Sequence, residues 1–227
     1  MLRVAGARVI GSEHRRREQN AQDACFAAAS DAGFVLVVSD GCGSTRAAEV
    51  GAALTAEVAG AVSMARLGAG VGAVEVASRA GGAVVERLAR VAGCVPRAAR
   101  ARFVEDHLMA TLLVVVGDAR DVALLAWGDG VAWVEGEARV IDEAGAPRYL
   151  AHALLGDACA VEPGLSWRAP RASVPRIAIA TDGLPRELLS GAFGHAGRGL
   201  PRWLNAQGAR RLLLDDAAVA LAEEVAS

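Results

Sequence analysis

Lysine is absent from this 227-residue chain, and all 24 of its basic residues are arginine. This absence excludes several enzyme classes, because a Walker-type phosphate loop, a Schiff-base enzyme and a protein kinase each require a lysine amine. The four cysteines, Cys25, Cys42, Cys94 and Cys159, form no Cys-x-x-Cys pair and no zinc-ligand spacing. Such widely separated cysteines are typical of a reducing compartment, so we expect a cytoplasmic protein.

Long hydrophobic runs and a strong net charge are lacking as well. The longest apolar stretch, Leu108 to Gly117, is too short to span a bilayer. The first residues place Arg3 and Arg8 in a short alternating segment, which is unlike a secretory signal. A formal net charge of -2 gives no overall attraction to nucleic acid or to anionic membranes. We therefore expect neither a nucleic-acid partner nor a membrane partner.

Length and composition indicate one globular domain. Hydrophobic residues make up 53% of the chain and charged residues 22%, as in ordinary globular proteins. A chain of 227 residues can bury one full core but is too short for two large ones. No internal repeat or low-complexity linker divides it. We predict a single domain over residues 1–227 and expect it to be a monomer.

Three apolar runs each end in Asp followed directly by Gly, at residues 35–40, 123–129 and 177–182. Continuous apolar runs of this length predict buried strands, so Asp40, Asp129 and Asp182 stand where strands leave the core. A single Asp-Gly pair is most often a turn. Three converging carboxylates, however, would repel one another unless a cation neutralised them, and sites built from oxygen favour Mg²⁺ or Mn²⁺.

Apolar alternation and turn residues predict strands with two long helical segments among them. The predicted strands are 3–10, 23–29, 33–39, 110–116, 122–127, 131–135, 139–141 and 177–180. We expect the first three to pair, with a hairpin turn at 30–33, and the four from 110 to 141 to form a meander. Helices are predicted from Glu49 to about Met64, after a cap at Ser44-Thr45, and from about Val71 to Val91.

Strands at both ends of the chain with helices between them indicate an α+β fold. Two antiparallel sheets packed together, with helices outside them, satisfy this order. Residues 93–106 are expected to form an exposed connection with a short helical piece. The end of the chain is ambiguous, because AAVALAEEVA has helical propensity while a strand would also bury Val219 and Leu221.

Six segments follow one another along the chain: GSEHRRREQNAQDACF, FVLVVSDGCGSTRAAEVGA, MATLLVVVG, LLAWGDGVAWV, IAIATDGL and LLLDDAAVAL. In this order they resemble the metal-dependent protein Ser/Thr phosphatases of the type 2C family, over nearly the whole chain. The most similar branch is the smaller bacterial type, whose Gly-x-x-His, Gln-Asp and Asp-Gly-x-Gly-Ser segments match Gly11 to His14, Gln22-Asp23 and Asp40 to Ser44. The resemblance implies a four-layer α-β-β-α sandwich and a final strand rather than a helix.

The resemblance also implies a site for two Mn²⁺ or Mg²⁺ ions. Asp40 matches the carboxylate that bridges the ions and positions the attacking water, and Gly41 matches the residue whose backbone carbonyl joins one of them. Asp182 and Asp215 match the ligands of the second ion. Glycine suits position 41, because it lets the backbone approach an ion closely.

Two further carboxylates are implied by the same resemblance. Asp23 matches an acidic residue that supports the metal cluster, mostly through bound waters. Asp129 matches the residue that, with Asp182, helps to hold a third and weaker ion in several members of the family.

Three positions depart from the family pattern. The phosphate-binding arginine of larger relatives lies shortly before their Glu-Asp pair, where Arg15 to Arg17 stand here, and we select Arg17. Gln22 replaces the glutamate of that pair, which removes one negative charge. Cys42 stands where larger relatives often have a histidine that protonates the leaving oxygen, so this role would pass to water or to another group. The four histidines have no ligand spacing among themselves, and we assign them no chemistry.

The implied function is the hydrolysis of phosphoserine and phosphothreonine in proteins that a Ser/Thr kinase has phosphorylated. Two cations that share Asp40 would lower the pKa of a bridging water and hold it in line with phosphorus, so no covalent phosphoenzyme is needed. Gln22 and Cys42 motivate an alternative, a pseudophosphatase that binds a kinase or phosphoprotein without turnover. A third hypothesis, an aspartate-nucleophile phosphatase of the haloacid dehalogenase type, uses Ile177 to Gly183 but lacks the Asp-x-Asp and the lysine of that class.

Overall fold

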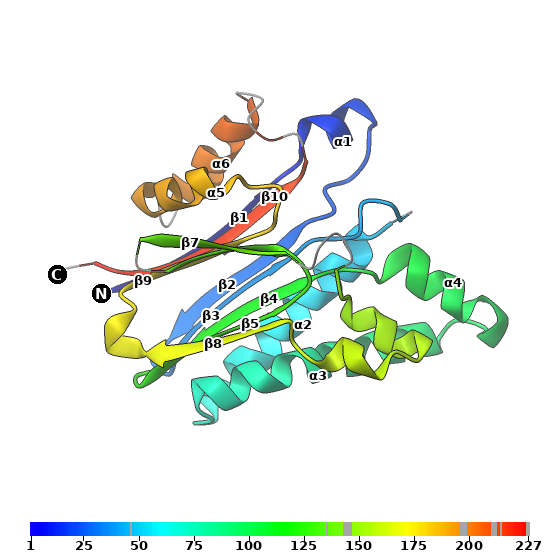
Figure 1. Cartoon of the computed structure of the whole chain (residues 1–227), viewed down its shortest axis with the longest axis horizontal. Coiled ribbons are helices and arrows are strands. Elements are labelled where there is room, and N and C mark those ends of the chain that lie inside the picture. Colours follow the sequence, from blue (N-terminus) through cyan, green and yellow to red (C-terminus); the bar gives the residue numbers. More distant parts are fainter. Residues whose placement is uncertain are drawn as a thin grey trace.

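Two five-stranded antiparallel sheets, packed face to face, occupy the centre of the molecule (Figure 1). They belong to a computed structural model that describes residues 1–45, 47–134, 136–142, 147–195, 199–209, 213 and 215–225. The first sheet consists, in order, of β1 (Leu2–Val9), β10 (Ala217–Glu224), β9 (Arg176–Ala180), β6 (Gly130–Val134) and β7 (Glu137–Ile141). The second consists of β2 (Ala24–Ser30), β3 (Gly33–Ser39), β4 (Leu112–Gly117), β5 (Asp121–Trp127) and β8 (Leu165–Pro170).

Helices cover the outer face of each sheet. The long helices α2 (Glu49–Gly68) and α3 (Ala73–Gly93) pack on the second sheet, and α4 (Arg97–His107) follows them. The short helices α5 (Arg186–Leu189) and α6 (Leu200–Ala209) lie on the first sheet (Figure 1). The remaining helices are α1 (Ser12–Arg16) and the 3-10 helices Leu150–Leu155, Ala158–Val161, Arg171–Ser173 and Ser190–His195. The predicted four-layer α-β-β-α sandwich is confirmed.

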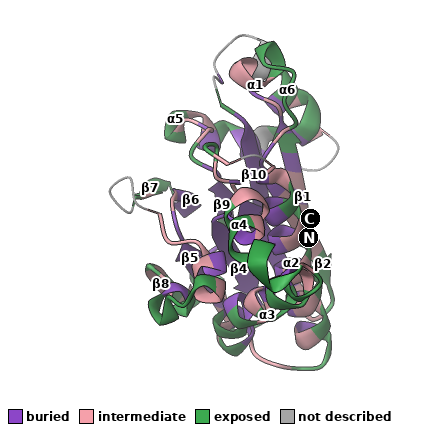
Figure 2. Cartoon of the chain, turned by 90° about the vertical axis from the view of Figure 1, so that its right-hand side faces the viewer, coloured by how far each residue is buried: buried purple, intermediate pink, exposed green. Residues whose placement is uncertain are grey.

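Buried residues concentrate in the two sheets, as the purple strands of Figure 2 show. Strand β3 shows why its apolar run is continuous. Val35 and Val37 pack toward α2 and α3, while Leu36 and Val38 pack into the space between the sheets. Because successive side chains of a strand point to opposite faces, a strand with both faces covered needs apolar residues at every position.

Strand β10 resolves the ambiguity at the end of the chain in favour of the strand. It lies between β1 and β9, so that Val219 pairs with Ala7 on one side and with Ala180 on the other. Ala218 and Ala220 face the second sheet, whereas Val219 and Leu221 face the covering helices. Pairing on both edges and burial on both faces outweigh the helical propensity of the segment.

Strand pairing at the start of the chain differs from the expectation. β1 does not pair with β2. It pairs with β10 in the first sheet, whereas the β2–β3 hairpin forms in the second sheet as predicted. The expected meander is likewise divided, because β4 and β5 join the second sheet while β6 and β7 join the first. Local turn signals identify strands, but they do not say to which sheet a strand belongs.

Helix α2 begins at Glu49, as predicted, but the predicted cap at Ser44-Thr45 is wrong, because Ala48 precedes the first helical residue. Thr45 donates its hydroxyl hydrogen bond to the carbonyl of Cys42 instead. The loop before α2 is held by backbone bonds from Cys42 to Met109 and from Ala47 to Asp106. Residues 93–106, expected to be an exposed connection with a short helical piece, contain most of the 11-residue helix α4.

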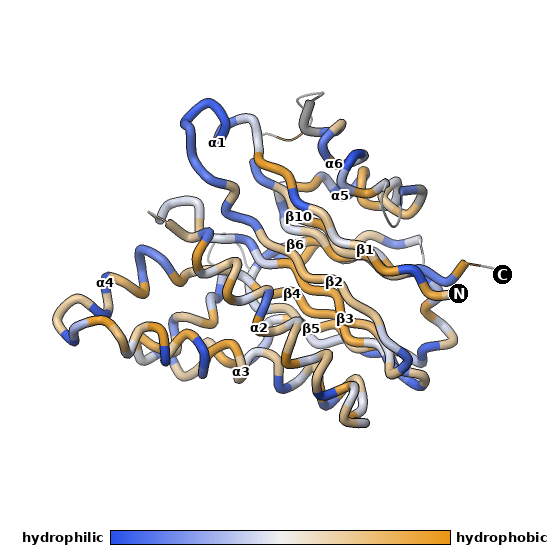
Figure 3. Tube along the Cα trace, turned by 180° about the vertical axis from the view of Figure 1, so that it is seen from behind, coloured by the Kyte–Doolittle hydropathy of each residue, from blue (hydrophilic) through white to orange (hydrophobic). Residues whose placement is uncertain are grey.

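Helix α2 is apolar and 20 residues long, so by length and composition alone it could cross a membrane. Its mean hydropathy over the best window is 1.3. In the fold, its small residues pack against the second sheet and α3, with Ala52, Ala56 and Ala59 fully or almost fully buried. Figure 3 shows hydrophobic residues following the strands beside this helix, while α1 and the segment that follows it are hydrophilic.

Two adjacent glycines of α3 allow a test of this packing. A methyl group at Gly81 would lie 2.6 Å from the ring of the buried Trp127, whereas one at Gly82 would meet nothing within 4 Å. We expect Gly81→Ala to lower the free energy of unfolding by about 1–3 kcal/mol through overpacking. Gly82→Ala should raise it by about 0.5–1 kcal/mol, because alanine favours the helix. Urea denaturation of both variants measures the difference, and equal effects would contradict the close contact between α3 and the Trp127 ring.

Candidate metal centre

Asp40 lies where β3 ends, and its backbone is fixed by the start of the neighbouring β4. The backbone N–H of Asp40 donates to Thr111 Oγ1 at 2.9 Å, and the backbone N–H of Thr111 donates to the carbonyl of Asp40 at 2.8 Å. Ser39 adds a hydroxyl bond of 2.6 Å to the Thr111 carbonyl. Thr111 therefore has a structural role, and it holds the backbone of Asp40 where this residue enters the site.

Asp23 is the buried centre of the site, with 2% of its surface exposed. It directly precedes β2, and its Oδ2 accepts a hydrogen bond of 2.5 Å from Thr181 Oγ1. Thr181 follows β9 and also accepts at its hydroxyl from the backbone N–H of Ala218, at 2.9 Å. Asp23 and Thr181 thus connect the two sheets at the end where the carboxylates gather.

A pocket of about 180 Å³ opens at this junction of the two sheets. It is lined by His14, Gln22, Asp23, Asp40, Gly41, Gly43, Asp182, Asp215 and Asp216. The structure therefore brings together five of the residues predicted for the metal site, which come from four separate segments of the chain. Asp182 and Asp215 are exposed, so the pocket has buried carboxylates at its base and solvated ones nearer its opening.

The two inner carboxyl groups perturb each other. Burial raises the pKa of Asp23 to about 6, even though hydrogen bonds from Asp40 and Thr181 oppose the rise. Burial and the charge of Asp23 raise the pKa of Asp40 well above its ordinary value. The two groups are hydrogen-bonded, and without a cation they share a proton rather than both ionising.

Asp129 belongs to the outer part of the site. Asp182 is exposed as a residue, but partial desolvation of its carboxyl group raises its pKa, and the charges of Asp129 and Asp215 raise it further. Asp129 does not line the pocket itself, but it lies within electrostatic reach of Asp182. Asp129 is thus linked to the site through Asp182.

Two glycines are required by close backbone approaches at the site. A methyl group at Gly183 would lie 1.7 Å from the carbonyl oxygen of Asp216, and one at Gly41 would lie 2.8 Å from the carbonyl oxygen of Ala48. The glycine that follows Asp182 therefore lets the ends of β9 and β10 converge. The glycine that follows Asp40 lets the loop before α2 fold back over the site.

Sequence reasoning missed two residues that contribute to the pocket, His14 and Asp216. Asp216 is buried and accepts hydrogen bonds from the backbone N–H groups of Gly11 and Gln22, at 2.7 and 2.6 Å. Its Oδ2 also lies 2.7 Å from Nδ1 of His14. His14 stood in the Gly-x-x-His segment and Asp216 directly after Asp215, so both were visible in the sequence without an assigned role.

Two other residues that the sequence analysis singled out, Arg17 and Cys42, do not line the pocket. The guanidinium of Arg17 is largely exposed, 3.7 Å from Glu13 Oε2. The sulfur of Cys42 lies 3.2 Å from the hydroxyl of Ser44. Burial raises the pKa of Tyr149, and a hydrogen bond with Cys42 raises it further. Tyr149 therefore stays a neutral phenol at the pH of any ordinary assay.

The donors that line the pocket fit a hard divalent cation. All of its acidic residues offer carboxylate oxygens, Gly41 adds a backbone carbonyl, and no cysteine takes part. The side-chain oxygen of Gln22 is buried and has no hydrogen-bond partner in the described part of the chain, so it is an acceptor that a bound water or cation would satisfy. Among the described residues, however, no three acidic, histidine or cysteine side chains are already arranged as a metal-binding group. The donor set fits, and the side chains would have to close around the ion.

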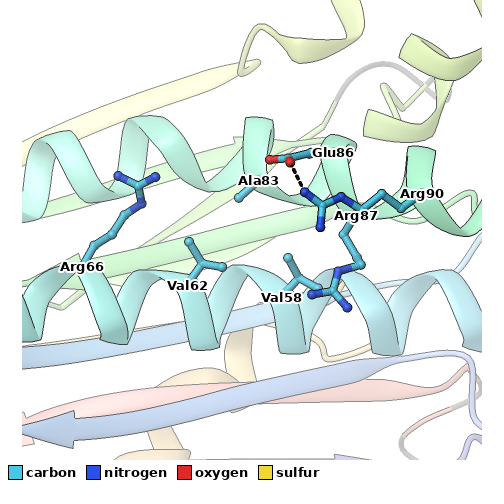
Figure 4. Close-up of a pocket in the computed structure, with 7 residues that line it drawn as sticks. All are labelled: Val58, Val62, Arg66, Ala83, Glu86, Arg87 and Arg90. Carbon is cyan, nitrogen blue, oxygen red and sulfur yellow. Dashed lines mark hydrogen bonds and ion pairs between the residues drawn. The ribbon is translucent and has the colours of Figure 1, made fainter.

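A second groove, of about 230 Å³, lies between α2 and α3 and has the opposite character (Figure 4). It is lined by Val58, Val62, Arg66, Ala83, Glu86, Arg87 and Arg90. Its single carboxylate, that of Glu86, lies 2.5 Å from the guanidinium of Arg90. A groove with three arginines and one paired acid does not suit a cation, so the carboxylate pocket is the candidate metal centre.

Comparisons with known proteins give a family match and structures with a similar fold. The family described as protein phosphatase 2C matches residues 10–216 of the chain. No curated protein matches it significantly by sequence.

Solved structures with a similar fold include several bacterial phosphatases. The serine/threonine phosphatase Stp1 from Staphylococcus aureus has a TM-score of 0.65 at 14% identity, covering 100% of this chain and 96% of that one. The catalytic domain of the serine threonine protein phosphatase PstP, in complex with two manganese ions, has a TM-score of 0.63 at 19% identity, covering 99% of both chains. PppA, a regulatory component of the type VI secretion system in Pseudomonas aeruginosa, has a TM-score of 0.59 at 20% identity and covers 98% and 97%.

The inner carboxyl pair gives the metal-free protein a pH-dependent stability. The ordinary pKa of an aspartate side chain is 3.8, and burial raises that of Asp23 to about 6 in the folded protein. Between these values the folded state holds more protons than the unfolded state, so stability falls as the pH rises from about 4 to about 7. A rise of this size in one pKa corresponds to a loss of about 3 kcal/mol, which belongs to the pair of Asp23 and Asp40. Urea denaturation in the presence of a chelator, repeated across this pH range, measures it.

Asp23→Asn should flatten this pH dependence, because an amide does not titrate. Asp31→Asn, in the exposed turn between β2 and β3, is the matched control and should leave the slope unchanged. A wild-type stability that increases over the same pH range would show that the two inner carboxyl groups are not packed together as described.

Proposed function

Because the chain belongs to the protein phosphatase 2C family, we propose that it hydrolyses phosphoserine and phosphothreonine in proteins, using Mn²⁺ or Mg²⁺ held in the carboxylate pocket. The observation that carries this proposal is the convergence of Asp23, Asp40, Asp182 and Asp215 on one pocket at the junction of the sheets. The proposed domain covers residues 1–227.

Asp40, Gly41, Asp182 and Asp215 would hold two ions, supported by Asp23 at the base of the pocket. Asp129, beside Asp182, would contribute to a third. When bound, such cations act as Lewis acids that lower the pKa of water and neutralise the charge of a phosphoryl group. The structure of PstP with two manganese ions supports the choice of metal.

The chain itself contributes rigidity and charge. Thr111 holds the backbone of Asp40 through one side-chain and one backbone hydrogen bond, which supports the position of this carboxylate while a substrate binds. The inner pair of Asp23 and Asp40 shares a proton without a cation, and a divalent ion would replace that proton. Metal binding should therefore release protons and relieve the repulsion within the pocket.

The shape of the pocket suits a phosphorylated side chain on a protein surface. The outer carboxylates of Asp182 and Asp215 are exposed, so a phosphoryl group can reach the site without a deep channel. We propose that the substrates are phosphoproteins made by a Ser/Thr kinase. Arg17 remains our candidate for a phosphate contact, because it stands on the exposed segment that follows His14.

Two further expectations belong to this proposal. All four cysteines are free thiols, which supports a reducing and therefore cytoplasmic setting. We also propose that the protein acts as a monomer. The aspartate-nucleophile hypothesis is wrong, because the chain belongs to the type 2C family and its two sheets are antiparallel.

A non-catalytic phosphoprotein-binding domain is the second candidate. The neutral Gln22 lies in the pocket, and no described group of three ligands is pre-assembled around it. Calorimetry separates the two functions. Tight binding of a phosphothreonine peptide without Mn²⁺ binding would favour the non-catalytic domain, whereas Mn²⁺ binding accompanied by proton release supports the enzyme.

We expect Asp40→Asn to reduce Mn²⁺-stimulated hydrolysis of a phosphothreonine peptide by about a hundredfold or more, because the variant loses the charge that would join two ions. Asp129→Asn should have a smaller effect and mainly increase the Mn²⁺ concentration needed for half-maximal activity. Phosphate release at several Mn²⁺ concentrations measures both.

Glu162→Gln removes one carboxylate from an exposed position outside the pocket, so it is the control for a simple change of charge. It should retain wild-type turnover. If the wild-type protein shows no Mn²⁺-stimulated turnover, or if Asp40→Asn remains fully active, the proposed enzyme function is wrong.

A further inference from the structure

His14 is the only histidine among the described residues that lines the carboxylate pocket. It lies in α1, between the first strand and the Gln22-Asp23 segment, and its side chain is 14% exposed. The imidazole is therefore neither a solvated surface group nor part of the apolar core. It faces the same pocket as Asp40 and Asp182.

One nitrogen of His14 is already occupied. Its Nδ1 lies 2.7 Å from Oδ2 of Asp216, whose side chain is only 3% exposed. The two backbone N–H groups that donate to Asp216 hold the carboxylate in place from Gly11 and from Gln22. A carboxylate on Nδ1 keeps a proton there, which leaves Nε2 as the nitrogen that can exchange a proton with a substrate.

The reaction requires a proton at this place. When the bond between phosphorus and the serine or threonine oxygen breaks, the electron pair stays on that oxygen as an alkoxide, which is a poor leaving group unless it is protonated. Two other groups near the pocket are less suited to supply the proton. Cys42 does not line the pocket, and Tyr149 has a raised pKa and is therefore a weaker acid than a free phenol.

We propose that His14 is the general acid of this phosphatase and that Asp216 is the residue that positions it. This inference rests on the proposed function. Hydroxide derived from water forms the new bond to phosphorus, the P–O bond to the substrate breaks, and Nε2 of protonated His14 gives its proton to the departing oxygen. The products are the free hydroxyl side chain, inorganic phosphate and neutral His14 with its remaining proton on Nδ1. Solvent then restores the proton on Nε2.

Leaving-group dependence tests this role. p-Nitrophenolate leaves readily without a proton, whereas phenolate and the alkoxide of threonine do not. We expect His14→Gln to hydrolyse phenyl phosphate and a phosphothreonine peptide about 10²–10⁴-fold more slowly than the wild type, but p-nitrophenyl phosphate at nearly the wild-type rate. Asp216→Asn should show the same selectivity with a smaller loss. His195→Gln, at an exposed position away from the pocket, is the control and should show no selectivity.

A second measurement does not depend on activity. In the metal-free wild-type protein, ¹⁵N NMR of the imidazole should place the proton of neutral His14 on Nδ1, and Asp216→Asn should remove this preference. A proton on Nε2 in the wild type would overturn the proposal. The proposal would also be overturned if His14→Gln lost activity equally on all three substrates and had a raised KM. That result is expected of a residue that binds phosphate rather than of a general acid.

The outcomes separate this inference from the function on which it rests. If the wild type has no Mn²⁺-stimulated turnover of any substrate, the proposed function fails. If His14→Gln keeps Mn²⁺-stimulated turnover of p-nitrophenyl phosphate, the proposed function stands. The rate on p-nitrophenyl phosphate relative to the rates on the other two substrates then decides the role of His14.

Discussion

The hydrogen bond between Thr181 and Asp23 is the contact on which the site depends. Asp23 enters the second sheet at β2, while Thr181 leaves the first sheet at β9. Thr181 also exchanges backbone and hydroxyl bonds with Ala218 of β10. This buried hydrogen bond therefore joins the two sheets at the site, in addition to the apolar residues packed between them. Asp40 and Asp182 follow strands of different sheets, so the packing of the sheets brings them to one pocket.

The same contact creates an electrostatic cost. It buries Asp23 beside Asp40, and the two carboxyl groups share a proton while the outer acids remain near solvent. An apolar pair at these positions would stabilise the fold without this repulsion. The arrangement is therefore better suited to binding a cation than to stability, which is the usual relation between a functional site and the fold that carries it.

The N-terminal segment is coupled to the C-terminal end of the chain through Asp216. Its carboxylate receives backbone hydrogen bonds from Gly11 and Gln22 and contacts His14, so it holds both ends of the connection between β1 and β2. This connection crosses from one sheet to the other. A single side chain thus secures the crossover and orients a histidine toward the carboxylates, which gives Asp216 a structural role and a functional one.

Apolar runs in the sequence predicted most strands, and the runs that end in Asp-Gly pointed to Asp40 and Asp182. The four-layer fold and the pocket residues Asp23 and Asp215 followed from the resemblance to a family. Strand partners could not be obtained in this way. β1 pairs with a strand more than 200 residues away, and a local pattern contains no information about such a contact. For the same reason the roles of His14 and Asp216 emerged only from the tertiary structure. Their interaction joins residues 202 positions apart, and burial rather than spacing brings them together.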